Sequence, residues 1–164
     1  MKIAIDARFY GLEHAGLGRY TTNLVSQLKK IDNKNRYYLL LKSKYFKTLK
    51  TSGRWKKVLA EVPHYSFREQ AVIPKILKQI NPDLFHALSV NYPVFYKGRS
   101  IITLHDLTQL SYTKKATTLP EPLYLIKHLG LRFVVRKAIR NAEKIIVPSK
   151  AVGRDLIDIH DVKF

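Results

Sequence analysis

The chain alternates short apolar runs with longer amphipathic stretches. Apolar runs of strand length cover residues 2–5, 37–41, 58–62, 84–87, 100–104 and 144–147. Apolar residues at helical spacing cover residues 17–31, about 68–80 and 121–142, and a last helix is expected from Ser149. Continuous apolar strands that alternate with amphipathic helices are typical of a parallel sheet with helices on both faces. The pattern therefore predicts an α/β fold, and residues 42–57 are the stretch that it assigns least clearly.

The first strand and the first helix are joined by a segment that contains two glycines. A polar loop follows the strand, and Gly16-Leu17-Gly18 comes directly before the amphipathic stretch. We predict a strand, a glycine turn and a helix, which together direct backbone N–H groups and the positive end of the helix dipole toward the strand end. A phosphate is the natural occupant of such a place, although two glycines can also serve only to let strand and helix pack closely.

Two departures argue against a dinucleotide-binding motif at this segment. Thr21 occupies the position where the third glycine of that motif is expected. The next apolar run is followed by Lys42, where the motif requires a carboxylate that binds the ribose. We therefore expect no nicotinamide cofactor, and no cofactor of another kind is indicated.

The predicted carboxyl ends of the other strands carry the remaining polar candidates. Ligands of open parallel sheets bind at these ends. His105 and Asp106 follow one strand, and a histidine there can exchange a proton or a hydrogen bond with a hydroxyl group. His105 is therefore the candidate catalytic residue, or else a structural histidine that only contacts loop backbone. For His86 we favour a structural role, and for Ser149 the default role is a helix N-cap.

Composition adds a strong positive charge to this picture. The 164 residues suit one domain, the absence of cysteine excludes disulfides and thiolate metal sites, and no metal-binding spacing such as His-Glu-x-x-His occurs. The formal net charge of +18 favours partners that are polyanions, unless it belongs only to a solvated basic surface. The N-terminus has no signal-peptide pattern, and no apolar run approaches the roughly 20 residues of a membrane span. We expect a cytoplasmic protein, soluble or peripheral on the inner face of the membrane.

Five short segments occur in an order that is typical of one enzyme family. They are MKIAIDAR at residues 1–8, GLGRY at 16–20, PDLFHA at 82–87, TLHDL at 103–107 and AEKIIVPS at 142–149. Together they resemble the N-terminal half of a family 4 glycosyltransferase with the GT-B fold. The resemblance covers essentially the whole chain. It implies a Rossmann-like, acceptor-binding half of a retaining enzyme that uses a nucleotide-sugar donor and needs no obligatory metal.

The resemblance also implies roles for individual residues. The glycine segment of the family approaches the donor diphosphate and the reacting sugar, which corresponds to Gly16, Leu17 and Gly18 here. The histidine of the TLHDL segment faces the transferred sugar and the acceptor, which corresponds to His105. Donor-side or supporting positions in the cleft correspond to Arg19, Asp106 and Ser149.

The resemblance further implies a second half that this sequence does not contain. The chain ends at Phe164, where the family continues into the domain that binds the donor and neutralises its diphosphate. We therefore expect residues 1–164 to form a single domain that is inactive by itself. Its partner would be a C-terminal donor-binding domain or a separate donor-binding chain.

The positive charge then has a candidate use at a membrane, because N-terminal halves of this family often dock there to reach lipid-linked acceptors. Polysaccharide acceptors are the other expected class. The candidate contacts lie in the segment 42–57, beside Tyr45 and Phe46: Lys47, Lys50, Arg54, Trp55, Lys56 and Lys57. The stripe Arg132, Arg136 and Arg140 is a second candidate, or simply a solvated helix face.

Two other functions remain open on the sequence alone. One is a basic, non-catalytic module that binds nucleic acid or a membrane, although no known nucleic-acid-binding motif occurs. The other is a scaffold half that recruits a donor-binding chain.

Overall fold

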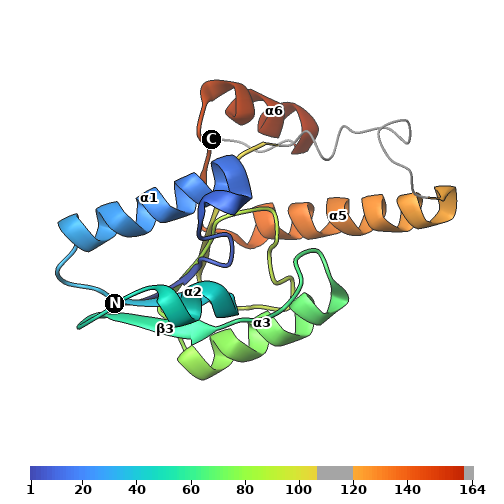
Figure 1. The fold of residues 1–164 in the computed structure, drawn as a ribbon. Helices are drawn as coiled ribbons and strands as arrows, with labels where there is room; N and C mark the ends of the chain where they lie inside the picture. The colour runs from blue at the N-terminus through green and yellow to red at the C-terminus, as the bar shows by residue number, and fades with distance from the viewer. Residues whose placement is uncertain (107–119, 161–164) are drawn as a thin grey trace.

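The computed structural model describes residues 1–106 and 120–160 (Figure 1). Leu107 of the TLHDL segment and the terminal Phe164 lie outside the described residues. The strands are β1 (Lys2–Asp6), β2 (Arg36–Leu41), β3 (Trp55–Leu59), β4 (Leu84–Ala87), β5 (Ser100–Thr103) and β6 (Lys144–Ile146). The helices are η1 (Leu12–His14), α1 (Ala15–Ile31), α2 (Ser43–Thr48), α3 (Phe67–Ile80), α5 (Glu121–Asn141) and α6 (Lys150–His160). The predicted α/β architecture is thereby confirmed.

The six strands form one sheet in the order β3-β2-β1-β4-β5-β6, and all neighbouring pairs are parallel. Strand β1 lies between β2 and β4, so the chain extends the sheet first in one direction and then in the other. Ligands of such sheets bind at this reversal point, outside the carboxyl ends of the strands. A ligand site is therefore expected at the carboxyl ends of β1 and β4.

Alternating side chains of the strands supply two separate cores. Ala4, Leu40 and Phe85 point into a cluster that also contains buried residues of α3 and α5. Ile5 and Leu39 point to the opposite face, into a cluster with α1 and α2. Successive residues of a strand face opposite sides of a sheet, so β1 and β2 each contribute to both clusters. The helices thus cover both faces, as the sequence pattern predicts.

The stretch 42–57 shows where that pattern is too weak. It contains α2, which the sequence analysis does not predict, and β3 begins three residues before the predicted strand at 58–62. Strand β3 lies at the edge of the sheet and includes Lys56 and Lys57, so it lacks a continuous apolar signature. Tyr45 and Phe46 of α2 pack against the cluster beside α1, so a tertiary contact defines this short helix.

Trp55 is also placed differently from its expected position at a membrane. Its side chain is buried, and its ring stacks on Tyr37 with 4.1 Å between the centroids. The Nζ atom of Lys29 lies 5.5 Å above the same ring. The indole therefore stabilises the edge of the sheet and is not available to contact a membrane, which corrects that expectation. No helix in residues 1–106 or 120–160 combines the length and the apolar character that crossing a membrane requires.

Candidate functional site

The carboxyl edge of the sheet contains a buried ion-pair group that the sequence analysis does not find. Arg8 lies two residues after Asp6, the last residue of β1, and its Nε and Nη2 atoms donate hydrogen bonds of 2.7 and 2.6 Å to the two carboxylate oxygens of Asp6. The Nη2 atom also donates to Oε1 of Glu69 on α3 at 2.6 Å. Arg8 is fully buried, and the two carboxylates are nearly so. This group fastens the loop after β1 to the first turn of α3.

The charges in this group influence one another. Burial alone would favour neutral Arg8, but the carboxylates of Asp6 and Glu69 outweigh it and raise the arginine pKa above its ordinary value. Burial raises the pKa of Glu69, against the opposing effect of Arg8. Glu69 also accepts a hydrogen bond of 2.8 Å from the Tyr65 backbone, while its own N–H donates to the N-cap hydroxyl of Ser66 at 3.2 Å. One carboxylate thus serves both the ion pair and the helix start.

A group of aromatic rings and histidines lies beside this ion pair. Phe9 stacks on His64 with centroids 3.8 Å apart, and His14 meets the edge of Phe9 at 5.3 Å. The side-chain amide of Asn91 lies 3.2 Å from Nδ1 of His64. Because an amide nitrogen donates, Nδ1 accepts and the proton of neutral His64 is on Nε2. Within the described part of the chain, this buried Nε2 has no hydrogen-bond partner.

His64 is expected to make stability depend on acid pH. Burial, and then the nearby charge of Arg8, lowers its pKa from 6.5 to about 3. The unfolded chain therefore binds a proton that the folded chain rejects, and stability falls as the pH drops from about 6.5 toward 3. Each such histidine removes up to about 1.4 kcal/mol per pH unit. Urea unfolding between pH 7 and pH 4 measures the slope, and His64→Phe, which retains the ring stack, should flatten it. An unchanged slope would contradict a neutral buried His64.

His105 lies just beyond the end of β5. Its ring meets the edge of Tyr20 from α1, with 4.6 Å between the centroids. Burial lowers its pKa, while a hydrogen bond to the Leu88 backbone and the charge of Asp106 act in the opposite direction. Its Nε2 atom is buried and has no partner among the described residues. A neutral imidazole with a free nitrogen can exchange a hydrogen bond with a substrate hydroxyl.

His86 differs from His105 because its side chain is buried within the sheet and its hydrogen-bond partner is a residue of the neighbouring strand. Its Nε2 atom lies 2.8 Å from Oγ1 of Thr103 on the neighbouring strand. The hydroxyl of Tyr20 lies 3.4 Å from the same Thr103 oxygen, which links α1 to β5. Burial lowers the pKa of His86 to about 4. These contacts fit the structural role that the sequence analysis favours.

The two glycines of the expected turn lie instead in the first turn of α1. Gly18 is buried, and a Cβ atom added there would collide with the carbonyl oxygen of Gly11. Gly16 is exposed, and a Cβ atom added there would meet nothing within 4 Å. The first turn carries no acidic residue, and its N-cap His14 makes no side-chain capping bond. Gly18 therefore allows α1 to pack closely against the Gly11 backbone. Gly16 instead leaves the backbone at the start of α1 accessible to a ligand.

The other residues named from the sequence have simpler surroundings. Arg19 is exposed on α1, one turn from its start. Leu17 is half-buried, and its carbonyl accepts a hydrogen bond of 2.8 Å from Thr21. The Ser149 hydroxyl accepts a hydrogen bond of 3.3 Å from the Val152 backbone and so acts as the N-cap of α6. The default role expected for Ser149 is thereby confirmed.

The residues that the sequence analysis misses are those brought together by the fold. They are Arg8, Phe9, His14, His64, Glu69 and Asn91. The one local signal is Asp6-x-Arg8 at the end of a buried strand, because charged residues in such a place require a partner. The other residues lie in segments far apart in the chain, and no spacing rule connects them.

The strand order, the helices on both faces and the open carboxyl edge together define a Rossmann-like α/β domain, the architecture of one half of a GT-B enzyme. The family model of Glycosyltransferase Family 4 matches residues 15–163. The chain therefore belongs to Glycosyltransferase Family 4. No curated protein matches the sequence.

Proposed function

We propose that this chain is the acceptor-binding half of a retaining glycosyltransferase, which transfers a sugar from a nucleotide-sugar donor to a lipid-linked or polysaccharide acceptor. The observation that carries the proposal is the unpartnered Nε2 of His105 at the same edge of the sheet as the uncapped start of α1. The family match supports it and does not favour a nucleic-acid-binding module.

The two features have complementary chemical roles in this proposal. The start of α1 presents backbone N–H groups and the positive end of a helix dipole, which suit the diphosphate of a nucleotide sugar. Neutral His105 forms a hydrogen bond with a hydroxyl of the transferred sugar or of the acceptor. Arg19 and Asp106 lie close by in sequence and assist from the rim of the cleft.

A donor-binding half would complete the site, as a further domain or as a separate chain. The departing diphosphate requires preorganised positive charge, and in this family that charge comes mostly from the donor-binding half. By this proposal the 164 residues alone do not transfer sugar, and no resident cofactor or metal takes part.

The two glycines provide a test with an internal control. Gly16→Ala adds a methyl group to the open start of α1. It should lower the rate of sugar transfer, measured with a panel of nucleotide sugars in a protein that also contains a donor-binding half. Its melting temperature should stay the same or rise slightly, because alanine is favoured over glycine in helices by up to about 1 kcal/mol. Gly18→Ala should lower the melting temperature, because its methyl group collides with Gly11. With a donor-binding half present, full activity of Gly16→Ala or absence of any transfer by the unmodified protein would contradict the proposal.

A further inference from the structure

The ring of His105 is held by contacts from two other parts of the chain. Tyr20 of α1 makes an edge contact with it, with 4.6 Å between the ring centroids and 80° between the ring planes. The backbone of Leu88, which directly follows β4, forms a hydrogen bond with the imidazole. Because Nε2 has no partner among the described residues, the nitrogen that forms this bond is Nδ1. The two ring nitrogens therefore have different surroundings.

The bond to Leu88 also determines which nitrogen of neutral His105 carries the proton. Burial lowers the pKa of His105, and the bond to the Leu88 backbone acts in the opposite direction. A carbonyl oxygen that accepts from the ring raises a histidine pKa, whereas a backbone N–H that donates to the ring lowers it. Nδ1 therefore donates to the Leu88 carbonyl, and Nε2 carries the lone pair. Neutral His105 thus offers a hydrogen-bond acceptor, which suits a hydroxyl group.

Tyr20 is itself held at the far end of its side chain. Its hydroxyl oxygen lies 3.4 Å from Oγ1 of Thr103, and Nε2 of His86 lies 2.8 Å from the same oxygen. His86 and Thr103 are both buried between neighbouring strands. The ring of Tyr20 packs against the cluster that contains Val25 of the same helix. The phenol therefore cannot turn away from His105 without losing contacts to the sheet.

Tyr20 also connects His105 with the open start of α1. It lies four residues after Gly16, so the two positions are about 40° apart around the helix. One turn of α1 thus presents backbone N–H groups at its start and an aromatic ring to His105. The proposed function combines these two features, and the helix fixes their relative position.

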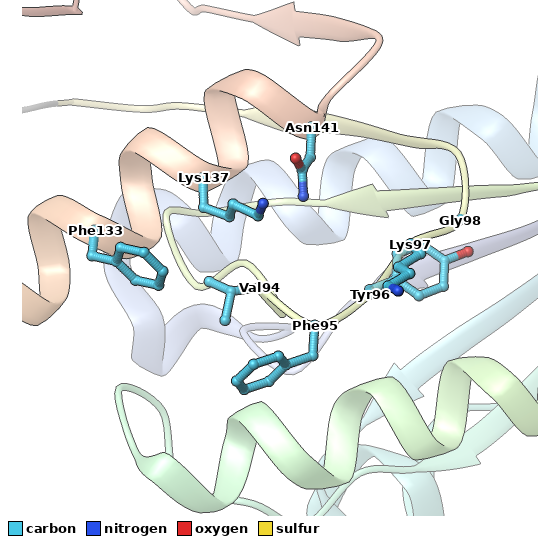
Figure 2. A pocket seen from close by; sticks show the side chains of 8 residues that line it. All are labelled: Val94, Phe95, Tyr96, Lys97, Gly98, Phe133, Lys137 and Asn141. Atoms are coloured by element: carbon cyan, nitrogen blue, oxygen red, sulfur yellow. The ribbon is translucent and has the colours of Figure 1, made fainter.

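A hollow of about 560 Å³ lies at the opposite edge of the sheet. Its lining residues come from the loop 94–98 and from α5 (Figure 2). Gly98 comes just before β5 and Asn141 just before β6, so the hollow lies toward the amino ends of these strands. His105 instead follows the carboxyl end of β5. A substrate that contacts His105 therefore does not occupy this hollow.

We propose that Tyr20 is a positioning residue for the transfer reaction: its ring, together with the Leu88 carbonyl, holds the His105 imidazole in one orientation, with Nε2 left as the acceptor for a substrate hydroxyl. A ring that could turn would present an N–H in place of the lone pair for part of the time, and it would lose rotational freedom when substrate binds. Tyr20 thus acts through His105. The catalytic part of this inference rests on the proposed function, whereas the fixed orientation of the ring does not.

The first test is NMR of the His105 ring in the 164-residue chain, because ring carbon and nitrogen shifts distinguish the two neutral tautomers. Unmodified His105 should be in the Nδ1–H form, with a pKa below 6.5. Tyr20→Leu should produce a measurable fraction of the Nε2–H form and move the pKa up toward 6.5, because the ring is less buried. Tyr20→Phe retains the ring and should leave both unchanged. The charge of Asp106 acts on His105 in every variant, so it does not affect the comparison.

The second test is kinetic, with a donor-binding half present. Tyr20→Leu should lower kcat by about 10- to 100-fold with KM nearly unchanged, and Tyr20→Phe should keep near-normal kcat. Val25→Ala is the control for stability, because Val25 is buried on the same helix more than one turn beyond Tyr20. It should lower the melting temperature and leave the tautomer and pKa of His105 unchanged. Circular dichroism checks that every variant is folded.

Three results would overturn the positioning role. They are an unmodified His105 in the Nε2–H form, a Tyr20→Leu chain with an unchanged tautomer and pKa, and a Tyr20→Leu enzyme with normal kcat. A Val25→Ala chain that alters His105 as Tyr20→Leu does would also overturn it, since the effect would then come from lost stability. The expected NMR results in a protein that transfers no sugar would instead overturn the proposed function, and with it the catalytic purpose of a ring that is nevertheless fixed.

Discussion

Replacement of Arg8 by methionine is expected to lower the free energy of unfolding by about 3–5 kcal/mol. The substitution keeps most of the apolar volume but leaves the carboxylates of Asp6 and Glu69 buried without their cation. A loss of this size is a large share of the roughly 5–15 kcal/mol that stabilises an ordinary domain. It should appear in urea unfolding as a lower midpoint with an unchanged dependence on denaturant.

The exposed pair of Arg99 and Glu143 provides the control for this prediction. Arg99 also donates two hydrogen bonds to one carboxylate, at 2.7 and 3.0 Å, but both side chains are largely in solvent. Arg99→Met should therefore leave stability almost unchanged, because water and salt screen the interaction. Comparable losses in the two variants would show that burial of the Arg8 group has no special importance.

Replacement of His105 by alanine is expected to lower kcat by about 10²–10³, with little effect on stability. A hydrogen bond that strengthens in the transition state typically contributes a few kcal/mol to catalysis. His105 is half-buried, and removal of its ring costs the fold the hydrogen bond to the Leu88 backbone and the edge contact with Tyr20, so the expected loss of stability is modest beside the loss of rate. The measurement is kcat, KM and melting temperature together, in the protein as encoded and with its donor-binding half present.

His86 is the matched control for His105. His86→Ala removes a buried hydrogen bond with Thr103 and leaves a cavity between β4 and β5. It should lower the melting temperature clearly and change kcat much less. A His105→Ala protein that keeps near-normal kcat but melts far earlier would show that His105 is structural and that its catalytic assignment is wrong.

Local patterns in the sequence were sufficient for the parallel α/β architecture. Five of the six strands lie within two residues of their predicted positions, because buried parallel strands appear as uninterrupted apolar runs. The exception is β3, an edge strand with two lysines, and the helix α2 just before it was not predicted. Both elements contain few apolar residues, and their structure depends on contacts with distant segments: α2 packs against the cluster that contains α1, and β3 pairs with β2.

The candidate site was predictable only in part, for a related reason. His105 and the glycine segment could be named from the sequence because each directly follows a recognisable strand or precedes a recognisable helix. The distinct roles of Gly16 and Gly18 depend on where the Gly11 carbonyl lies, which no spacing reveals. The same holds for His64, whose partners Phe9 and Asn91 come from two other loops.

The sequence by itself determined the secondary-structure alternation, the positive charge and the family segments, since all three are local properties of the chain. The tertiary structure decided the strand order, the partners of Arg8, the burial of Trp55 and the exposure of Leu129 and Phe133 on α5. Each of these depends on which distant segments pack together. Periodicity specifies that a residue faces a core, but only packing specifies what it meets there.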